Sequence, residues 1–275
     1  MYGAIIGDIA GSRFEFYNRK SKDFTLFDKN CEFTDDSVMT IAVAKALVES
    51  KKNKYEDLEE QLIFWMHEIG KRYPNCGYGG KFYYWIMNDE TKPYSSFGNG
   101  SGMRTAMCAE IAESLEEALD LAKRCAAVTH NHEEGIKGAK AITAAAYLAK
   151  SGSDKKEIGD YIRKHFYTID FTLDEIRKNY HFDVTCQGSV PQAIESFLES
   201  ESYEDCIRNA ISIGGDSDTI AAMAVSSSLR PHKPKGGSYK SSSFALIETI
   251  SSKWFRLGLG SSLVTMRLSL QRWMT

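Results

Sequence analysis

The sequence lacks several features by which protein classes are recognised. No apolar run approaches the about 18 residues that a membrane-spanning helix needs, so we expect no membrane association. The six cysteines form no Cys-x-x-Cys pair, which indicates reduced thiols in the cytoplasm rather than a zinc site or a disulfide framework. Lys and Arg (34) do not exceed Asp and Glu (37), so we expect no nucleic-acid partner. The first eight residues lack the basic and apolar segments of a secretory leader.

The sequence is also poor in strand signals. No alternating apolar stretch is bounded by hairpin turn residues. Apolar residues instead recur at helical spacing, for example over residues 58–69 and 136–147. We therefore predict an all-α fold, a single compact multi-helix domain, with its loops at residues 16–33, 73–103 and 179–188.

Hydroxyl residues predict where three of the helices begin. Ser114, Thr172 and Ser189 each stand three positions before a Glu or Gln, which is the spacing of a capping box. Pro191 would fall in the first turn of the third helix, where proline is tolerated.

Charge divides the chain near residue 225. Residues 225–275 hold eight basic side chains, one acidic side chain and twelve serines, whereas residues 1–224 hold 26 basic and 36 acidic side chains. We therefore predict a helical domain over residues 1–224 and an atypical basic, Ser-rich segment over residues 225–275. Two explanations stay open for this segment: a shift of the reading frame near residue 225, or a divergent C-terminus that forms amphipathic helices.

Two acidic clusters stand just ahead of predicted helices. The first is Thr-Asp-Asp-Ser at residues 34–37, and the second is Gly-Gly-Asp-Ser-Asp-Thr at residues 214–219. One acid suffices to cap a helix, but adjacent carboxylates repel each other unless a cation lies between them. Oxygen ligands without His or Cys select Mg²⁺, Ca²⁺ or Mn²⁺. If the clusters meet in space they form a two-metal site; the alternative is that both only cap helices.

Three further features are candidates for binding or catalysis. Asp8 and Glu15, seven positions apart, could share one helix face beside such a site or lie on a surface helix. The glycines of residues 98–104 allow main-chain amides to surround an anion at the start of a predicted helix over residues 103–113, with Arg104 adding charge. A flexible surface loop is the alternative. We expect His130 in a polar pocket.

Six motifs in this order resemble the ADP-ribosylglycohydrolase family, which includes dinitrogenase-reductase-activating glycohydrolase and the eukaryotic ADP-ribosyl-hydrolases. The resemblance runs from Gly3 to about Ala224. The motifs are Gly-Asp-x-x-Gly-x-x-x-Glu at 7–15, Thr-Asp-Asp-Ser at 34–37, Gly-Tyr-Gly-Gly at 77–80, Gly-Asn-Gly-Ser-Gly-Met-Arg at 98–104, Thr-His at 129–130 and Gly-Gly-Asp-Ser-Asp-Thr at 214–219.

The resemblance implies a compact all-helical fold with two Mg²⁺ ions, or Mn²⁺, in a cleft. The implied metal ligands are Thr34, Asp35, Asp36, Asp216, Asp218 and Thr219. The implied substrate-binding residues are Gly98, Asn99, Gly100, Ser101, Gly102, Met103 and Arg104 around the pyrophosphate, and His130 at the ribose. Glu15 matches an acid beside the metal centre, and Glu15, Asp35 or Asp36 would accept a proton from the attacking water.

The implied activity is magnesium-dependent hydrolysis of the glycosidic bond between ADP-ribose and an acceptor, in an ADP-ribosylated protein or a small ADP-ribose conjugate. Two alternatives stay open: a catalytically silent ADP-ribose-binding relative, and a metal-dependent phosphohydrolase. A phosphohydrolase of the haloacid-dehalogenase type needs a buried strand before its Asp-x-Asp pair, whereas residues 207–213 are predicted to be helical. The acceptor linkage stays open, and a monomer is the default oligomeric state.

Overall fold

The computed structural model describes residues 1–226, and these residues are helical apart from their loops and one isolated bridge between Gly98 and Thr185. The all-α prediction is therefore confirmed for this part of the chain. Residues 227–275 of the predicted Ser-rich segment over 225–275, and with them the question of its reading frame, lie outside the described residues. The helices are α1 (Tyr2–Gly11), the 3₁₀ helix η1 (Ser12–Phe14), α2 (Asp35–Lys51), α3 (Leu58–Gly70), α4 (Gly80–Met87), α5 (Gly100–Met103), α6 (Ala106–Ile111), α7 (Leu115–Ala127), α8 (Glu133–Ser151), α9 (Lys155–His165), α10 (Leu173–Arg177), α11 (Cys186–Leu198), α12 (Tyr203–Ser212) and α13 (Ser217–Ser226).

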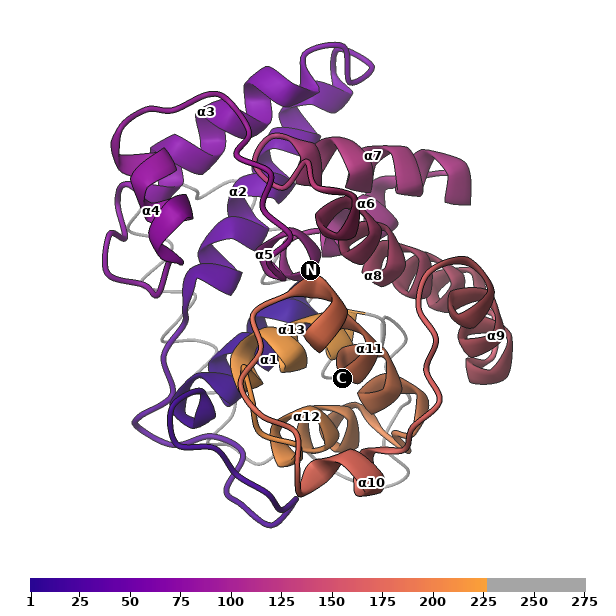
Figure 1. The fold of residues 1–275 in the computed structure, drawn as a ribbon. Helices are drawn as coiled ribbons and strands as arrows, with labels where there is room; N and C mark the ends of the chain where they lie inside the picture. Colours follow the sequence, from indigo (N-terminus) through magenta and orange to yellow (C-terminus); the bar gives the residue numbers. More distant parts are fainter. Residues whose placement is uncertain (227–275) are drawn as a thin grey trace, which may run out of the picture. The chain divides into compact units, whose positions relative to one another are not determined.

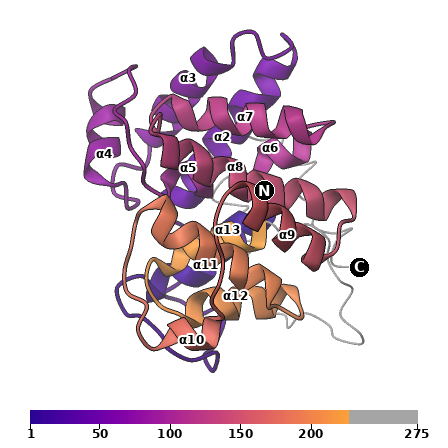
Figure 2. The ribbon, with the colours of Figure 1, turned by 45° about the vertical axis from the view of Figure 1, so that its right-hand side comes forward.

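The helices pack in two groups, which contact each other chiefly through α8 with α11 and through α1 with α2. In Figures 1 and 2, α2, α3, α6, α7 and α8 lie together, and α1, α11, α12 and α13 lie together below them. α1 packs along α13, from the other end of the described chain, and it also contacts α2. The N-terminal helix therefore lies between the two helices that follow the acidic clusters.

Glycines allow α1 and α13 to approach each other closely. A Cβ atom on Gly7 would lie 2.6 Å from the main-chain carbonyl of Ala221, and one on Gly11 would lie 2.5 Å from the Cα atom of Asp218. Main chain meets main chain at these points, so a side chain there has no room. The close contact places Asp8 beside the first turn of α13.

Replacing Gly7 with alanine is therefore expected to destabilise the fold by about 2 kcal/mol, because the added methyl group forces the two backbones apart. Gly80→Ala is the matched control, since nothing lies within 4 Å of a Cβ atom at Gly80. Chemical denaturation of both variants measures the difference. Equal stability of the two variants would show that the α1–α13 contact tolerates a side chain.

The structure corrects one predicted helix start and qualifies another. Thr172 closes a full capping box with Glu175, as predicted. Ser114 accepts a hydrogen bond from the main chain of Glu117, but the Glu117 carboxylate accepts from Glu113 instead of from Ser114. The start at Ser189 is wrong. α11 begins a turn earlier, because the hydroxyl of Thr185 accepts from the Gly188 amide.

The region predicted as a loop over residues 73–103 contains two helices, α4 and α5. The helix predicted over residues 103–113 is confirmed over residues 106–111 as α6, but it begins later than predicted, since the chain turns at Arg104 and Thr105. Glycines and aromatic residues are poor helix formers, so local sequence does not mark α4. Its buried Trp85, which stacks on His67 of α3, shows that packing stabilises it.

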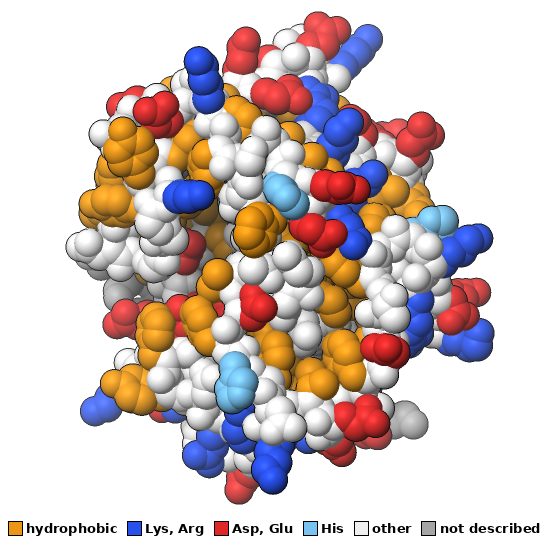
Figure 3. Space-filling view, in the orientation of Figure 1, with side chains coloured by type: hydrophobic (Ala, Val, Ile, Leu, Met, Phe, Trp, Pro, Cys, Tyr) orange, Lys and Arg blue, Asp and Glu red, His pale blue; other side chains and the backbone are white. Residues whose placement is uncertain are grey.

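Three features of the described residues concern membrane helices, cysteines and surface charge. None of the helices in residues 1–226 is long and apolar enough to cross a membrane. All six cysteines lie in this part of the chain as free thiols. On the face drawn in Figure 3, acidic and basic side chains of the described residues are interspersed.

Candidate metal centre and substrate loop

The first acidic cluster lies at the start of α2 and is held there by Asp8. Asp8 is fully buried, and its carboxylate accepts hydrogen bonds from the main-chain amides of Thr34 and Ser37, both 3.0 Å, and from both of their hydroxyls. Thr34 caps the helix through its side chain. These bonds fix the first turn of α2 and therefore the positions of the Asp35 and Asp36 side chains.

Sequence reasoning noted Asp8 but did not find this role. Asp8 and Glu15 do not share one helix face, because α1 ends at Gly11 and Glu15 follows η1. The sequence signal for this role is that Asp8 is the one acid in the apolar run of residues 4–10. An acid in such a run is expected to be buried, and a buried carboxylate needs several hydrogen-bond donors.

The second acidic cluster lies at the start of α13. Gly214 and Gly215 adopt left-handed backbone conformations, with φ of +71° and +78°, and the turn brings the chain back beside Glu15. Asp216 and Asp218 follow directly and are 5% and 3% exposed. Both glycines are needed because this conformation strains any residue with a Cβ atom.

The two clusters meet in space. The hydroxyl of Thr219 donates a hydrogen bond of 2.9 Å to one carboxylate oxygen of Asp36, 183 positions away in the sequence. The other oxygen of Asp36 is buried and has no hydrogen-bond partner. Such an orphaned oxygen is costly unless a further group satisfies it.

Glu15 completes the acidic centre. One carboxylate oxygen from each of Glu15, Asp216 and Asp218 lies within 4.8 Å of the other two. Burial raises the pKa of Asp35, and Asp35 is close enough for the charges of Asp218 and Glu15 to raise its pKa further. A Cβ atom on Gly77 would lie 3.1 Å from the Asp35 carboxylate. The Gly-Tyr-Gly-Gly motif thus borders the same centre.

Burial and mutual repulsion raise the pKa of these carboxyl groups. Burial, with Asp218 next in effect, raises the pKa of Glu15 to about 8. Burial, with Glu15 also acting, raises the pKa of Asp216 to about 6. The pKa values of Asp35, Asp36 and Asp218 are raised for the same reasons, burial first and neighbouring carboxylates second. Burial and repulsion therefore disfavour the charged forms of these carboxyl groups unless cations lie between them.

The chemistry of this centre fits divalent cations. Within residues 1–226, none of the ion pairs involves Glu15, Asp35, Asp36, Asp216 or Asp218. The atoms available as metal ligands are carboxylate and hydroxyl oxygens, which suit Mg²⁺, Mn²⁺ or Ca²⁺ rather than zinc. The unpartnered oxygen of Asp36 is available as a further ligand atom.

The glycine loop reaches this centre through Asn99. The side-chain amide of Asn99 donates a hydrogen bond of 2.7 Å to Asp216, and its main-chain amide donates to the carbonyl of Val184. Ser101 is buried and donates to the carbonyl of Gly135, 2.7 Å away, which anchors the loop on α8. Gly102 and Met103 are buried, whereas Gly98 and Gly100 are partly exposed.

Arg104 does not lie where the sequence indicated. Its side chain is fully buried, and it donates to the carbonyl of Cys125 (2.9 Å) and the hydroxyl of Thr129 (2.7 Å). The guanidinium therefore holds the end of α7 beside the loop instead of facing an anion. A charge next to a glycine loop does not by itself show which way the side chain turns.

His130 is buried and lies against the glycine loop. Its Nδ1 atom is 2.7 Å from the hydroxyl of Thr129, and a Cβ atom on Gly100 would lie 3.4 Å from its Nε2 atom. Burial lowers the pKa of His130, which favours the neutral ring. The Thr129 hydroxyl, which accepts from Arg104, also shares a hydrogen bond with Nδ1.

The phosphohydrolase alternative requires a buried strand before the second acidic cluster. α12, a helix, precedes Asp216 and Asp218, and the described residues contain no strand there. The geometry of a haloacid-dehalogenase-type site is therefore not met.

Comparison with known proteins agrees with this architecture. A family described as ADP-ribosylglycohydrolase matches residues 1–225. ADP-ribosylhydrolase ARH3 of Xenopus tropicalis is 24% identical over 82% of this chain and 83% of its own length. ADP-ribosylarginine hydrolase Tri1 of Pseudomonas putida is 25% identical over 82% of this chain and 67% of its own. ADP-ribosyl-(dinitrogen reductase) glycohydrolase of Rhodospirillum rubrum is 23% identical over 81% of this chain and 80% of its own.

A solved structure also shares the fold. An ADP-ribosylglycohydrolase-related protein complex superposes with a TM-score of 0.59 and 19% identity, over 82% of this chain and 83% of that one. The family match covers residues 1–225 of 275, so most of the chain carries it. The protein therefore belongs to the ADP-ribosylglycohydrolase family.

Proposed function

We propose that this protein hydrolyses the glycosidic bond between ADP-ribose and an acceptor, and that it needs two divalent ions, Mg²⁺ or Mn²⁺, to do so. The observation that carries the proposal is the meeting of Glu15, Asp36 and the Asp216–Asp218 pair at one buried centre. Relatives named for ADP-ribose hydrolysis support the same reaction class.

The ligands we assign to the ions are Thr34, Asp35, Asp36, Asp216, Asp218 and Thr219. When bound, the ions would polarise the ribose hydroxyls and lower the pKa of a water molecule. Cleavage at the anomeric carbon develops positive charge on the ribose, which nearby carboxylates stabilise.

The residues of this chain supply orientation and proton transfer. The glycine loop over residues 98–104 would bind the pyrophosphate, with Gly100 lying beside His130, and the His130 ring would contact the ribose. Glu15, Asp35 or Asp36 accepts a proton from the attacking water. Glu15 suits this role because its carboxylate lies within 4.8 Å of those of Asp216 and Asp218 and is not among the assigned ligands.

A panel of ADP-ribose conjugates tests the proposal. Arginine-linked, serine-linked and O-acetylated ADP-ribose are incubated with the full-length protein, with Mg²⁺ or with EDTA, and free ADP-ribose is measured. We expect release from at least one conjugate with Mg²⁺ and loss of release in EDTA. Binding of ADP-ribose without hydrolysis of any conjugate in saturating Mg²⁺ would instead identify a catalytically silent relative.

A further inference from the structure

Asn18 connects the two chain segments that carry the acidic side chains. Its side-chain nitrogen lies 2.9 Å from the carbonyl of Phe14, 2.8 Å from the carbonyl of Glu15 and 3.0 Å from the carbonyl of Gly215. Its side-chain oxygen accepts a hydrogen bond of 2.7 Å from the amide of Gly215. One side chain therefore holds the main chain at Glu15 and the main chain just before Asp216.

The partners of Asn18 require both a donor and an acceptor in a short side chain. Main-chain carbonyls only accept and the Gly215 amide only donates, so these partners also settle which atom of the side-chain amide is the oxygen. Alanine and leucine supply neither group. Leucine matches asparagine in size, and it therefore separates the loss of the hydrogen bonds from the loss of bulk.

The turn at Gly214 and Gly215 packs closely against Asn18 and Tyr180, with no room for a side chain at either glycine. A Cβ atom on Gly214 would lie 2.9 Å from the Asn18 oxygen, and one on Gly215 would lie 2.4 Å from the ring of Tyr180. Lys20 adds a second contact, since its ammonium donates to the carbonyls of Ile213 and Tyr180. The loop after Glu15 is thus hydrogen-bonded to the turn that precedes Asp216 through Asn18 and Lys20.

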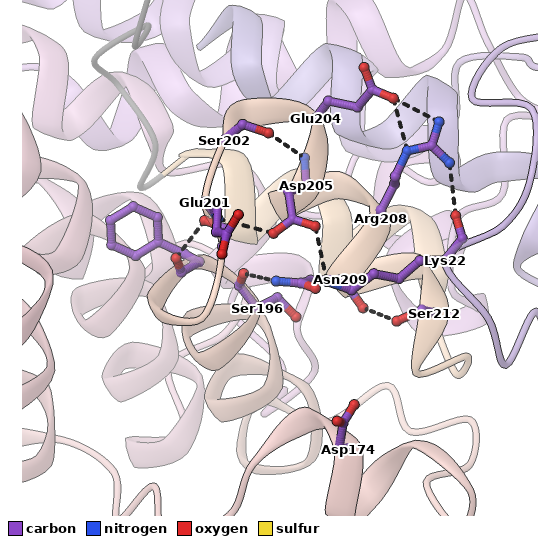
Figure 4. Close-up of polar contacts among 12 residues, drawn as sticks. Lys22, Asp174, Ser196, Glu201, Ser202, Glu204, Asp205, Arg208, Asn209 and Ser212 are labelled. Atoms are coloured by element: carbon purple, nitrogen blue, oxygen red, sulfur yellow. Dashed lines mark hydrogen bonds and ion pairs between the residues drawn. The ribbon is translucent and has the colours of Figure 1, made fainter. Parts of the chain in front are cut away.

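The segment that contains Asn18 is also anchored at its far end. Figure 4 shows Lys22 beside Asp205 of α12, with Arg208 next to it. The ammonium of Lys22 lies 2.9 Å from the Asp205 carboxylate, and Arg208 donates to the carbonyl of Lys22 at the same distance. Arg208 is itself held by Glu204. Asn18 therefore acts from a segment fixed on α12, the helix that leads into the second acidic cluster.

We propose that Asn18 is a positioning residue of the acidic centre, and that its side-chain amide sets the separation between Glu15 and the Asp216–Asp218 pair and hence the affinity for divalent ions. This inference rests on the proposed function. Residues that orient metal ligands typically change metal affinity by about 10–100-fold when they are replaced. Asn18 holds the main chain at Glu15 and the turn before Asp216 at once, so its loss shifts the ligands Asp216 and Asp218 relative to the rest of the centre.

The test compares Asn18→Ala and Asn18→Leu with the wild type and with Asn30→Ala, an exposed asparagine of the same loop. Full-length proteins are freed of ions with a chelator and titrated with Mn²⁺ by calorimetry, and their melting temperatures are measured in EDTA. We expect both Asn18 variants to bind Mn²⁺ at least about tenfold more weakly, with Asn30→Ala unchanged. Their melting temperatures in EDTA should stay near that of the wild type.

Hydrolysis gives a second measure. For the Asn18 variants, kcat should fall at limiting Mn²⁺ and recover as Mn²⁺ is raised, which a merely destabilised fold would not show. Wild-type ion affinity in both Asn18 variants would overturn the inference, and so would a lower melting temperature in EDTA with unchanged ion affinity. A wild-type protein that binds no divalent ion would overturn the proposed function itself.

Discussion

Replacing Asp216 with alanine is expected to abolish divalent-ion binding and to lower turnover by at least about a thousandfold, because ions contribute several kcal/mol to transition-state stabilisation. The helices should persist, since the change also removes one of the mutually repelling carboxylates. Calorimetric titration with Mg²⁺, conjugate hydrolysis and circular dichroism measure the three effects. Asp36→Ala should behave in the same way.

The matched control for these variants is Asp174→Ala. Asp174 is an acid of α10 whose side chain is 85% exposed, and it pairs with Arg177. This variant should keep both ion binding and turnover. Turnover retained by purified Asp216→Ala after metal removal would refute the assignment of Asp216 as a metal ligand.

The stability of the ion-free protein should depend strongly on pH. In EDTA we expect a melting temperature at least about 5 °C higher at pH 5.5 than at pH 8, on the scale of a few degrees per kcal/mol. Folding raises the pKa of Glu15 from 4.5 to about 8 and that of Asp216 from 3.8 to about 6. The folded state therefore binds protons more tightly than the unfolded state, and stability is lost as the pH rises from about 4 to about 8.

Saturating Mg²⁺ should reduce this pH dependence, because bound cations compensate the charge that protons otherwise neutralise. Thermal scans at both pH values, in EDTA and in Mg²⁺, give the comparison. Asp216→Ala in EDTA should show a smaller pH effect than the wild type. An equal slope with and without Mg²⁺ would mean that the carboxyl groups of this centre do not control stability.

Local sequence predicted most helices because their signals are local. Apolar spacing indicated α3 and α8, and the hydroxyl of Thr172 with Glu175 marked the start of α10. α4 was missed because its aromatic residues gain stability only when Trp85 is buried against α3. Arg104 was misplaced for a similar reason, since its direction depends on Cys125 and Thr129 rather than on its neighbours in the loop.

The sequence by itself determined the helical class of residues 1–226, the two acidic clusters and the family, because periodicity, caps and motifs are properties of short segments. Only the tertiary structure decided that Asp36 meets Thr219, that Glu15 faces Asp216 and Asp218, and that Asp8 and Asn18 hold these segments in place. The physical reason is distance along the chain. Contacts between residues nearly two hundred positions apart arise from the packing of α1 between α2 and α13, which no local pattern encodes.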